Sequence, residues 1–229
     1  MTYPQVELEN VSVCFGEHEA LTDVSLSLRA RRTAVIGSNG SGKSTFARLL
    51  NGLTLPTAGR VRVHGLDPVR QARELRRRVG FIFSNPDAQI VMPTPVEDVA
   101  FSLRGSGLVR AEVQRRTTDA LARYGLSAHA EKPAHSLSGG QKQLLALCAV
   151  LIREPLLVVA DEPTAFLDAA NARRIRDLLL EDMPQPLVLV THDLAMAARC
   201  DEVIRFEEGR VVEQGEPDAV IAGYERVLA

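Results

Sequence analysis

The sequence predicts an α/β fold whose core is a mainly parallel sheet. Short apolar runs, typical of buried strands, alternate with amphipathic helical patterns through the last third of the chain. One apolar run leads directly into a glycine-rich loop and then into a helical pattern. Strands joined by helices pair in parallel and are covered on both faces. With 229 residues, 45% of them hydrophobic, the chain has enough material for a large buried core.

The N-terminal part predicts strands and one helix. Residues Val6–Phe15 and Leu21–Leu28 alternate apolar and polar side chains, which indicates an N-terminal antiparallel β subdomain. Residues 33–37 form a short apolar run that ends in glycine, as a buried strand does before a turn. A helix is expected from Lys43 to about Gly52, and a further strand over 59–65.

The middle of the chain has helical periodicity. Apolar residues recur at helical spacing from Val96 to about Tyr124, and a second helix is expected over 140–153. We therefore predict a helical subdomain at about 86–133, inserted into a single domain that spans 1–229. The basic stretch Arg70–Arg78 is interpreted as a solvated loop.

The last third alternates strands and helices. The expected order is a strand over 156–161, a helix over 171–180, a strand over 187–191, a short helix over 194–200 and a hairpin over 203–215 that turns at Glu208-Gly209.

Composition and charge exclude several classes of protein. The 27 basic and 29 acidic residues give a formal net charge of -2, so no whole-protein field attracts nucleic acid or an anionic membrane. The cysteines Cys14, Cys148 and Cys200 are odd in number and far apart, which favours a reducing compartment. The first ten residues lack a signal-peptide pattern, and the longest apolar run is shorter than the roughly 20 residues of a spanning helix. We expect a soluble, intracellular chain.

The glycine-rich loop matches the phosphate-binding pattern G-x-x-x-x-G-K-[ST] between a strand and a helix. The candidate ligands of a nucleotide are Gly37, Ser38, Asn39, Gly40, Ser41, Gly42, Lys43, Ser44 and Thr45. Loop N–H groups and the helix N-terminus attract the phosphates, Lys43 adds a mobile charge, and the Ser44 hydroxyl would ligate Mg²⁺. The alternative is a Gly/Ser-rich turn that matches by chance.

Two acidic residues and a histidine follow apolar strands. Asp161 is placed to hold Mg²⁺ through water, and Glu162 to act on the attacking water as a general base. His192 should lie beside them and reach the γ-phosphate, because its strand is expected next to the carboxylate strand. The other histidines are expected to be surface residues; these are His18, His64, His129 and His135.

A third segment, residues 137–141 with the sequence LSGGQ, precedes a helix. Small residues at a helix start expose N–H groups that bind anions. The alternative is a plain helix cap made by Ser138.

Together these motifs give a chain that resembles the ATPase subunit of an ABC transporter over nearly its whole length. The resemblance identifies the phosphate loop as Walker A, VVADEP as Walker B, LSGGQ as the family signature and residues 165–168 as the D-loop. It implies that Phe15 stacks on adenine and that His192 is the switch histidine. It also implies ATP ligands in the signature and D-loop, namely Ser138, Gly139, Gly140, Gln141 and Asp168.

The segment Phe83–Leu103 is similar to the energy-coupling-factor group, which serves vitamin, cobalt and nickel importers. That group reads F-Q-N-P-D-x-Q here, and Ser84 replaces its first glutamine, which contacts Mg²⁺ and the attacking water. Ser84 and Gln89 are the candidates to take over that contact, although the Ser84 hydroxyl has a shorter reach. The nearest resemblance is to biotin and cobalt importer ATPases.

The resemblance implies a peripheral ATPase on the cytoplasmic face of the cell membrane. Its partners would be a second copy or a paralogous ATPase, a transmembrane coupling subunit and a substrate-binding membrane subunit, with no nucleic acid. A non-transport ABC ATPase is the main alternative. A GTPase would need an N-K-x-D motif, a kinase would not use LSGGQ, and Glu162 with His192 argues against a binding-only module. The cargo, and the choice between homodimer and heterodimer, stay open.

Overall fold

The computed structural model describes residues 5–228 and divides them into two compact units. The first unit comprises residues 5–81, 156–162 and 179–228, and the second comprises residues 82–155 and 163–178. Part of the N-terminal segment that we expected not to be a signal peptide, residues 1–4, lies outside the described residues.

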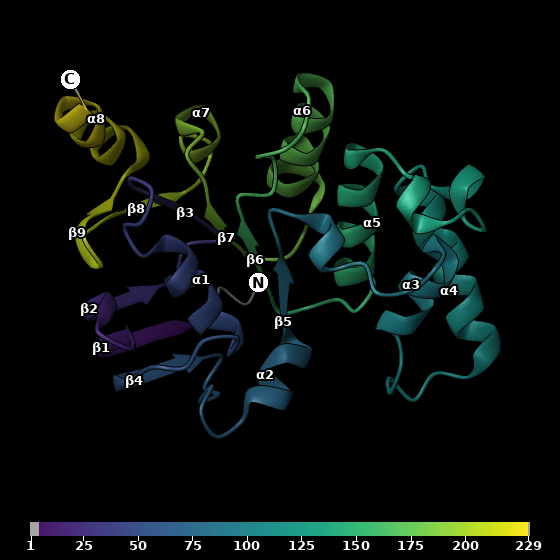
Figure 1. Cartoon of the computed structure of the whole chain (residues 1–229), viewed down its shortest axis with the longest axis horizontal. Helices are drawn as coiled ribbons and strands as arrows, with labels where there is room; N and C mark the ends of the chain where they lie inside the picture. The colour runs from purple at the N-terminus through teal and green to yellow at the C-terminus, as the bar shows by residue number, and fades with distance from the viewer. Residues whose placement is uncertain (1–4, 229) are drawn as a thin grey trace. The chain divides into compact units, whose positions relative to one another are not determined.

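A six-stranded sheet runs through the first unit in the order β5-β6-β7-β3-β8-β9 (Figure 1). Its strands are β3 (Arg32–Ile36), β5 (Val79–Ile82), β6 (Leu157–Asp161), β7 (Leu187–Val190), β8 (Glu202–Glu207) and β9 (Arg210–Gly215). The pairs β6–β7, β7–β3 and β3–β8 are parallel, and every residue of β6 and β7 is buried. The prediction of a mainly parallel, doubly covered sheet is confirmed.

The antiparallel edge of this sheet is the predicted hairpin. Strands β8 and β9 pair antiparallel across Glu208 and Gly209, whose φ angles are 46° and 77°. Two consecutive residues with positive φ are what the right-handed twist of a tight hairpin requires, and glycine adopts this conformation without steric cost.

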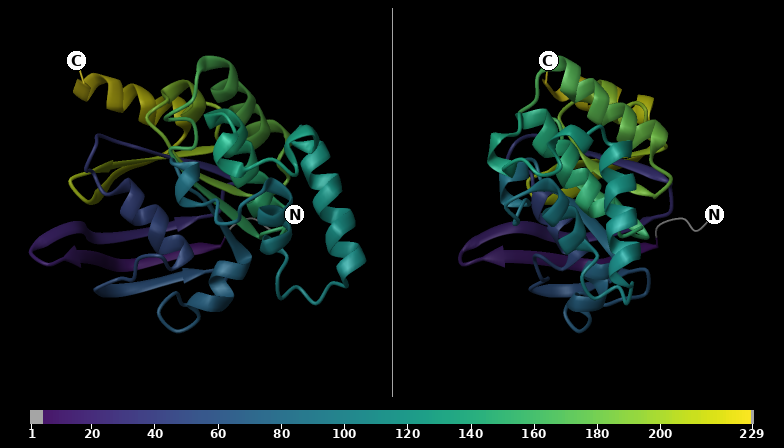
Figure 2. Two further views of the ribbon diagram at one scale, coloured as in Figure 1. Left: turned by 45° about the vertical axis from the view of Figure 1, so that its right-hand side comes forward. Right: turned by 90° about the vertical axis from the view of Figure 1, so that its right-hand side faces the viewer.

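A second sheet in the same unit is antiparallel and has the order β2-β1-β4 (Figure 2). Its strands are β1 (Val6–Phe15), β2 (His18–Leu28) and β4 (Ala58–Val63). Strand β1 alternates buried and exposed side chains over its first half, as expected for a sheet with one face toward a core. The predicted N-terminal antiparallel subdomain is confirmed.

The helices of the first unit are α1 (Lys43–Asn51), α2 (Ala72–Arg78), α7 (Leu194–Ala197) and α8 (Pro217–Leu228). Helix α1 ends at Gly52, which caps it in the left-handed conformation, and its fully buried Phe46 packs on Phe206 with ring centroids 5.2 Å apart. Helix α8 lies against β8 and β9 and was not predicted.

Our interpretation of Arg70–Arg78 as a solvated loop is wrong. Most of the stretch forms α2, because Leu75 is completely buried and supplies an apolar anchor for one face. The pair Glu74–Arg78, at 2.6 Å, adds an i,i+4 contact on the exposed face. His64 also differs from the expected surface histidine: it is half-buried, and burial together with the charge of Arg78 lowers its pKa.

The second unit is helical. Its helices are α3 (Pro95–Ser102), α4 (Arg110–Arg123), α5 (Gly139–Leu151) and α6 (Ala169–Asp177). A π-helical turn, Leu178–Asp182, follows α6 and leads into the first unit. The helical pattern predicted over 96–124 is interrupted between α3 and α4, where Gly105 and Gly107 have φ angles of 78° and 80°. Helix α3 packs on both α4 and α5.

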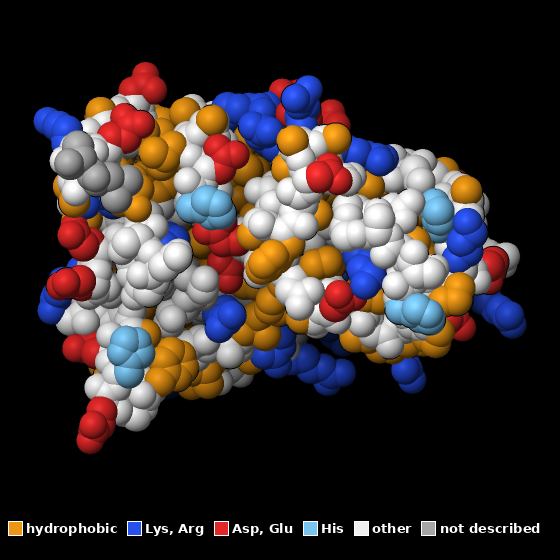
Figure 3. Space-filling model, turned by 45° about the horizontal axis from the view of Figure 1, so that its top comes forward, with side chains coloured by type: hydrophobic (Ala, Val, Ile, Leu, Met, Phe, Trp, Pro, Cys, Tyr) orange, Lys and Arg blue, Asp and Glu red, His pale blue; other side chains and the backbone are white. Residues whose placement is uncertain are grey.

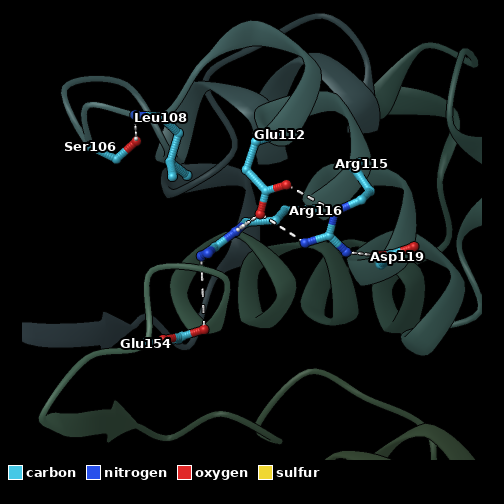
Figure 4. A network of polar contacts seen from close by, with 7 residues as sticks. All are labelled: Ser106, Leu108, Glu112, Arg115, Arg116, Asp119 and Glu154. Carbon is cyan, nitrogen blue, oxygen red and sulfur yellow. Dashed lines mark hydrogen bonds and ion pairs between the residues drawn. The ribbon is translucent and has the colours of Figure 1, made fainter.

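An ion-pair network covers the exposed face of α4 (Figure 4). The Glu112 carboxylate accepts hydrogen bonds from Arg115 and Arg116, which lower its pKa to about 2. Arg115 also bonds Asp119, and Arg116 lies 4.0 Å from Glu154, beyond the end of α5. Exposed pairs of this kind are screened by solvent, so the network orders side chains more than it stabilises the fold.

Surface charge of both signs is interspersed on the face drawn in Figure 3, with apolar side chains between the charges. Among residues 5–228, none of the helices combines the length and the apolar character that crossing a bilayer requires.

The three cysteines are free and differ in exposure: Cys14 is exposed on β1, whereas Cys148 and Cys200 are buried. Burial raises the pKa of each buried thiol to about 12.

We predict that a thiol reagent at pH 8 labels Cys14 quickly and leaves Cys148 and Cys200 protonated and unreactive, because the thiolate is the nucleophile. Spectrophotometric titration should count one thiol in the native protein and three in denaturant. Cys14→Ser should remove the fast phase; a second fast thiol in that variant would contradict the burial.

Candidate functional site

The phosphate loop joins β3 to α1 and is held against neighbouring backbone at two glycines. A Cβ on Gly37, at φ 144°, would lie 2.2 Å from the carbonyl oxygen of Phe206. A Cβ on Gly42, at φ 99°, would lie 2.6 Å from the carbonyl oxygen of Ala20. Both positions therefore admit only glycine, and the close approach fixes the loop between the two sheets of the first unit.

Lys43 begins α1 and folds back over its own loop. Its ammonium donates hydrogen bonds to the carbonyl oxygens of Gly37 at 2.8 Å and Ser38 at 2.7 Å. Burial lowers the pKa of Lys43, and the charges of Glu162 and Asp161 act in the opposite direction. The loop thus holds a buried cation among carbonyls, within reach of an anion that enters the loop.

A buried hydroxyl in the same loop has no hydrogen-bond partner among residues 5–228. The Ser41 side chain is 2% exposed, and its Oγ is such an orphaned atom. Buried polar groups are nearly always satisfied, so an orphan in a glycine-rich loop indicates a ligand atom that the protein itself does not supply. The loop therefore fits a phosphate group.

Ser44 and Asp161 meet at the start of α1 and the end of β6. The Ser44 hydroxyl donates to the Asp161 carboxylate at 3.0 Å. Burial raises the pKa of Asp161, while the Ser44 hydrogen bond and the charges of Arg48 and Lys43 lower it. Hydroxyl and carboxylate oxygens are the ligands that Mg²⁺ prefers, and two of them suit an ion completed by phosphate and water. The described residues contain no cluster of three or more His, Cys, Asp or Glu side chains for a metal.

Glu162 and His192 form a pair at the ends of adjacent strands. Strands β6 and β7 are parallel neighbours, as predicted, and the Glu162 N–H donates to the Val190 carbonyl at 3.0 Å. Glu162 has a φ of 50°, which turns the chain sharply after β6. His192 Nδ1 lies 2.7 Å from Glu162 Oε2. This geometry can hold a carboxylate in place to accept a proton from water.

Phe15 is the last residue of β1 and belongs to the same unit as the phosphate loop. The residue is 54% exposed, so its side chain is accessible to a partner ring. The predicted adenine contact stays a prediction.

The signature segment lies in the second unit and forms a capping box at the start of α5. The Gln141 N–H donates to Ser138 Oγ at 3.3 Å, and the Ser138 N–H donates to Gln141 Oε1 at 2.9 Å. The amides of Gly139 and Gly140, in the first turn, have no acceptor within the described part of the chain. The segment thus caps α5 and also leaves two backbone N–H groups, those of Gly139 and Gly140, available to an anion.

Asp168 caps α6 and is linked to the signature segment by Asn171. The Asp168 carboxylate accepts hydrogen bonds from the Asn171 backbone and side chain, each at 2.8 Å, and these lower its pKa. The Asn171 side chain lies directly against Gly140, where a Cβ would come within 2.2 Å of Asn171 Cγ. Asn171 was not among the predicted site residues. Its position three residues after a capping Asp was the available signal.

Ser84 and Gln89 lie in the second unit, Ser84 beside the first turn of α5 and Gln89 against its middle. The Gln89 carboxamide accepts from the Phe83 N–H and donates to the Ala146 carbonyl, both at 3.2 Å, so each end already has a backbone partner. Ser84 is half-buried and lines a cavity of about 260 Å³ together with Phe166 and the ion pair Lys142–Asp87. Magnesium ligation by Ser84 or Gln89 stays a prediction.

His129 is not the plain surface residue that we expected. Its Nε2 lies 3.0 Å from Nε2 of Gln141, in the signature segment. No pattern in the sequence relates these two residues, because His129 ends the turn at 127–129 and Gln141 lies in the first turn of α5, in a separate element.

The predicted residues therefore fall into two groups. One unit brings together the phosphate loop, Asp161, Glu162, His192 and Phe15, and the other holds Ser84, Gln89, the signature segment and Asp168.

Comparison with known proteins adds a family match and related chains. A family model described as "ABC transporter" matches residues 21–165. The chain is 42% identical to the biotin transport ATP-binding protein BioM of Rhizobium etli, over 98% of this chain and 99% of that protein. It is 41% identical to the energy-coupling factor transporter ATP-binding protein EcfA1 of Symbiobacterium thermophilum, over 100% and 85% of the two chains.

The fold is also similar to a solved structure. That structure is cbiO1 from Clostridium perfringens, described as part of the ABC transporter complex cbiONQ. The TM-score is 0.85 at 33% identity, and the match covers 99% of this chain and 94% of that chain.

The contact between Gly140 and Asn171 leads to a prediction. Gly140→Ala should destabilise the protein by about 1 kcal/mol relative to Gly139→Ala, because the new Cβ displaces the Asn171 side chain from its hydrogen bond to Asp168. Gly139→Ala is the matched control, since its Cβ would have no neighbour closer than Leu167 at 4.0 Å. Denaturant unfolding measures both variants. Adding Asn171→Ala should recover part of the loss in Gly140→Ala, and an additive double variant would show that the overlap is not the cause.

Proposed function

Because this chain belongs to the ABC transporter family, we propose that it is the ATP-hydrolysing subunit of an energy-coupling-factor importer. One observation carries the proposal: a single compact unit gathers a phosphate loop with its lysine, a Ser–Asp oxygen pair and a Glu–His pair. This is the set of groups that phosphoryl transfer to water needs. We also propose that both units belong to one ATPase domain, 1–229, with a helical subdomain at about 86–133.

The nucleotide would bind through residues 37–45. In this proposal the loop amides and Lys43 take the β- and γ-phosphates, so Lys43 exchanges its contacts with the Gly37 and Ser38 carbonyls for phosphate oxygens. Phe15 stacks on the adenine ring. Ser44 and Asp161 would hold Mg²⁺, which when bound would supply positive charge to the phosphate oxygens.

Hydrolysis would depend on Glu162. Its carboxylate accepts a proton from the attacking water as the water oxygen bonds to the γ-phosphorus, and the bond between that phosphorus and the bridging oxygen breaks toward ADP. His192 holds the carboxylate through Nδ1, at 2.7 Å, which leaves its Nε2 to face the γ-phosphate. Because Nδ1 already donates to the carboxylate, Nε2 can donate to a phosphate oxygen only when the imidazole carries both ring protons.

A second copy, or a paralogous subunit, would complete the site. The signature segment supplies the Gly139 and Gly140 amides and the Ser138 hydroxyl, which are suited to the γ-phosphate held by a partner's phosphate loop. Gln141 and Asp168 support this contact. Shifting such a pair from 1:99 to 99:1 closed requires about 5.5 kcal/mol, or roughly 3 kcal/mol for each ATP, which a few charge-assisted hydrogen bonds can supply. Loss of the γ-phosphate then lets the pair open.

Closure would act on membrane subunits. The cavity that contains Ser84, Phe166 and the pair Lys142–Asp87 combines an exposed ring with a charge pair, which suits a short helix of a transmembrane coupling subunit. A substrate-binding membrane subunit would complete the importer, and the ATPase would lie on the cytoplasmic face of the cell membrane. The clostridial neighbour is described as part of the ABC transporter complex cbiONQ, which supports this arrangement.

The cargo that we propose is a micronutrient, either biotin or cobalt, or another vitamin. The name of the Rhizobium protein supports biotin. A relative from Syntrophus aciditrophicus, 38% identical over 95% of this chain and 80% of that protein, is named as a cobalt import ATP-binding protein, which supports cobalt. Affinity capture of the tagged chain from native membranes, with identification of the membrane subunits, tests the assignment. Recovery of subunits of an unrelated ABC transporter would favour the alternative, an ATPase of another transporter class.

Removal of the Lys43 charge should abolish function. Lys43→Ala should lose ATP binding, or turnover by at least a hundredfold, because no other cation of the loop replaces the ammonium. Phosphate release and equilibrium binding of a fluorescent ATP analogue measure the two effects. Lys132→Ala, an exposed lysine in the second unit, is the matched control and should behave as wild type. Turnover near the wild-type rate in Lys43→Ala would refute the phosphate-loop assignment.

Neutralising Glu162 should separate binding from hydrolysis. Glu162→Gln keeps the shape and the hydrogen bond to His192 but removes the base, so ATP should bind while turnover falls by about 100-fold to 10,000-fold. Size-exclusion chromatography in Mg-ATP should then show a trapped dimer. The control is Glu216→Gln at an exposed position of the same unit. A monomer with normal turnover would mean that Glu162 is not the base.

A further inference from the structure

The carboxamide of Gln141 has one orientation that satisfies its surroundings. Its Oε1 accepts the Ser138 N–H at 2.9 Å, so its Nε2 is the atom that faces Nε2 of His129 at 3.0 Å. An amide nitrogen can only donate a hydrogen bond. The contact is therefore a hydrogen bond only when His129 Nε2 carries no proton and the ring proton is on Nδ1.

This orientation decides which donors the signature segment presents. In the capping box, Ser138 Oγ accepts the Gln141 N–H, so the hydroxyl proton points elsewhere. The Ser138 and Gln141 amides are both consumed inside the box, and the Gly139 and Gly140 amides are left. If the carboxamide turned over, its NH₂ group would meet the Ser138 N–H, two donors would oppose each other, and the box would open.

The imidazole is held in place by its own turn. His129 ends a 3₁₀ turn, Ser127–His129, in which its N–H donates to the Leu126 carbonyl at 2.9 Å, and Leu126 is fully buried. Its carbonyl accepts the Lys132 N–H at 3.0 Å on the other side. The ring thus approaches α5 from a fixed backbone rather than from a free surface loop, and the histidine is half-buried.

We propose that His129 is a positioning residue for the signature segment. Through one accepted hydrogen bond it selects the Gln141 rotamer that keeps the Ser138 capping box closed, and so presents the Ser138 hydroxyl and the Gly139 and Gly140 amides to an anion. The consequence for ATP rests on the function proposed above, in which this segment binds the γ-phosphate held by a second subunit. His129 itself does not touch the nucleotide.

Three substitutions separate the accepted hydrogen bond from simple packing. His129→Leu fills space without an acceptor, His129→Arg offers only donors, and His129→Gln restores an acceptor oxygen at a similar reach. His135→Leu is the matched control, because His135 belongs to the next turn of the same segment and is exposed. The Glu162→Gln full-length chain is the background, so that hydrolysis does not affect the readout.

The measurement is the ATP concentration that gives half-maximal dimer formation with Mg-ATP, read by light scattering. We expect this ATP concentration to rise about fivefold in His129→Leu, because one hydrogen bond to Gln141 is lost. It should rise further in His129→Arg, because a donor facing the Gln141 NH₂ group would also open the Ser138 capping box. His129→Gln should stay within about twofold of the background, as should His135→Leu. Thermal unfolding of every variant verifies that the fold is intact.

The outcomes distinguish this inference from the proposed function. If His129→Gln is impaired as much as His129→Leu, or if His129→Leu matches the His135→Leu control, the positioning role is wrong while ATP-driven dimerisation stands. If the background chain itself shows no ATP-dependent dimer, the proposed function fails first. A direct test needs no nucleotide: NMR of labelled histidine should find His129 with its proton on Nδ1, and a proton on Nε2 would overturn the proposal.

Discussion

Parallel pairing of three central strands is the constraint on which the rest of the first unit depends. Val190 of β7 is paired in register with Val35 of β3 and with Asp161 of β6. Because the carboxyl ends of neighbouring parallel strands lie at the same edge of a sheet, the residues that follow these strands lie close together. The phosphate loop, the Asp161–Glu162 pair and His192 follow these strands, so a single hydrogen-bond register assembles the candidate site.

Burial maintains that register. Strands β6 and β7 are wholly buried, and a slip by one residue would exchange the two faces of each strand and misplace the groups at its end. The close approaches at Gly37 and Gly42 then hold the loop to its neighbours, and Glu162, at a positive φ, contacts His192 through its carboxylate. Close packing and a strained backbone therefore occur together at the carboxyl ends of these strands, where they fix the positions of Lys43, Asp161 and Glu162.

The second unit uses helix ends instead of strand ends. Ser138 caps α5 and Asp168 caps α6, and Asn171 bonds Asp168 while its side chain lies against Gly140. A capping residue accepts hydrogen bonds from some backbone N–H groups of the first helical turn and leaves others without a partner. The capping residues therefore decide which N–H groups are available to an anion. His129 adds an acceptor to this arrangement from outside the motif.

Much of this molecule could be predicted from the sequence, because its signals are local. Alternating and continuous apolar runs predicted both sheets, a glycine after Asn51 predicted the end of α1, and the strand–loop–helix context made Lys43 and Ser44 candidates. Sequence patterns did not predict the helices that form only because a side chain is buried against the rest of the fold. Helix α2 forms in a basic stretch because Leu75 is buried, and α8 forms against β8 and β9. The sequence by itself determined the family of motifs and the residues that carry their chemistry. The expected strand order also placed His192 beside Glu162. Only the tertiary structure decided which atoms meet, namely that Ser44 Oγ bonds Asp161, that His192 Nδ1 bonds Glu162 and that His129 contacts Gln141, because side-chain contacts between separate elements depend on long-range packing.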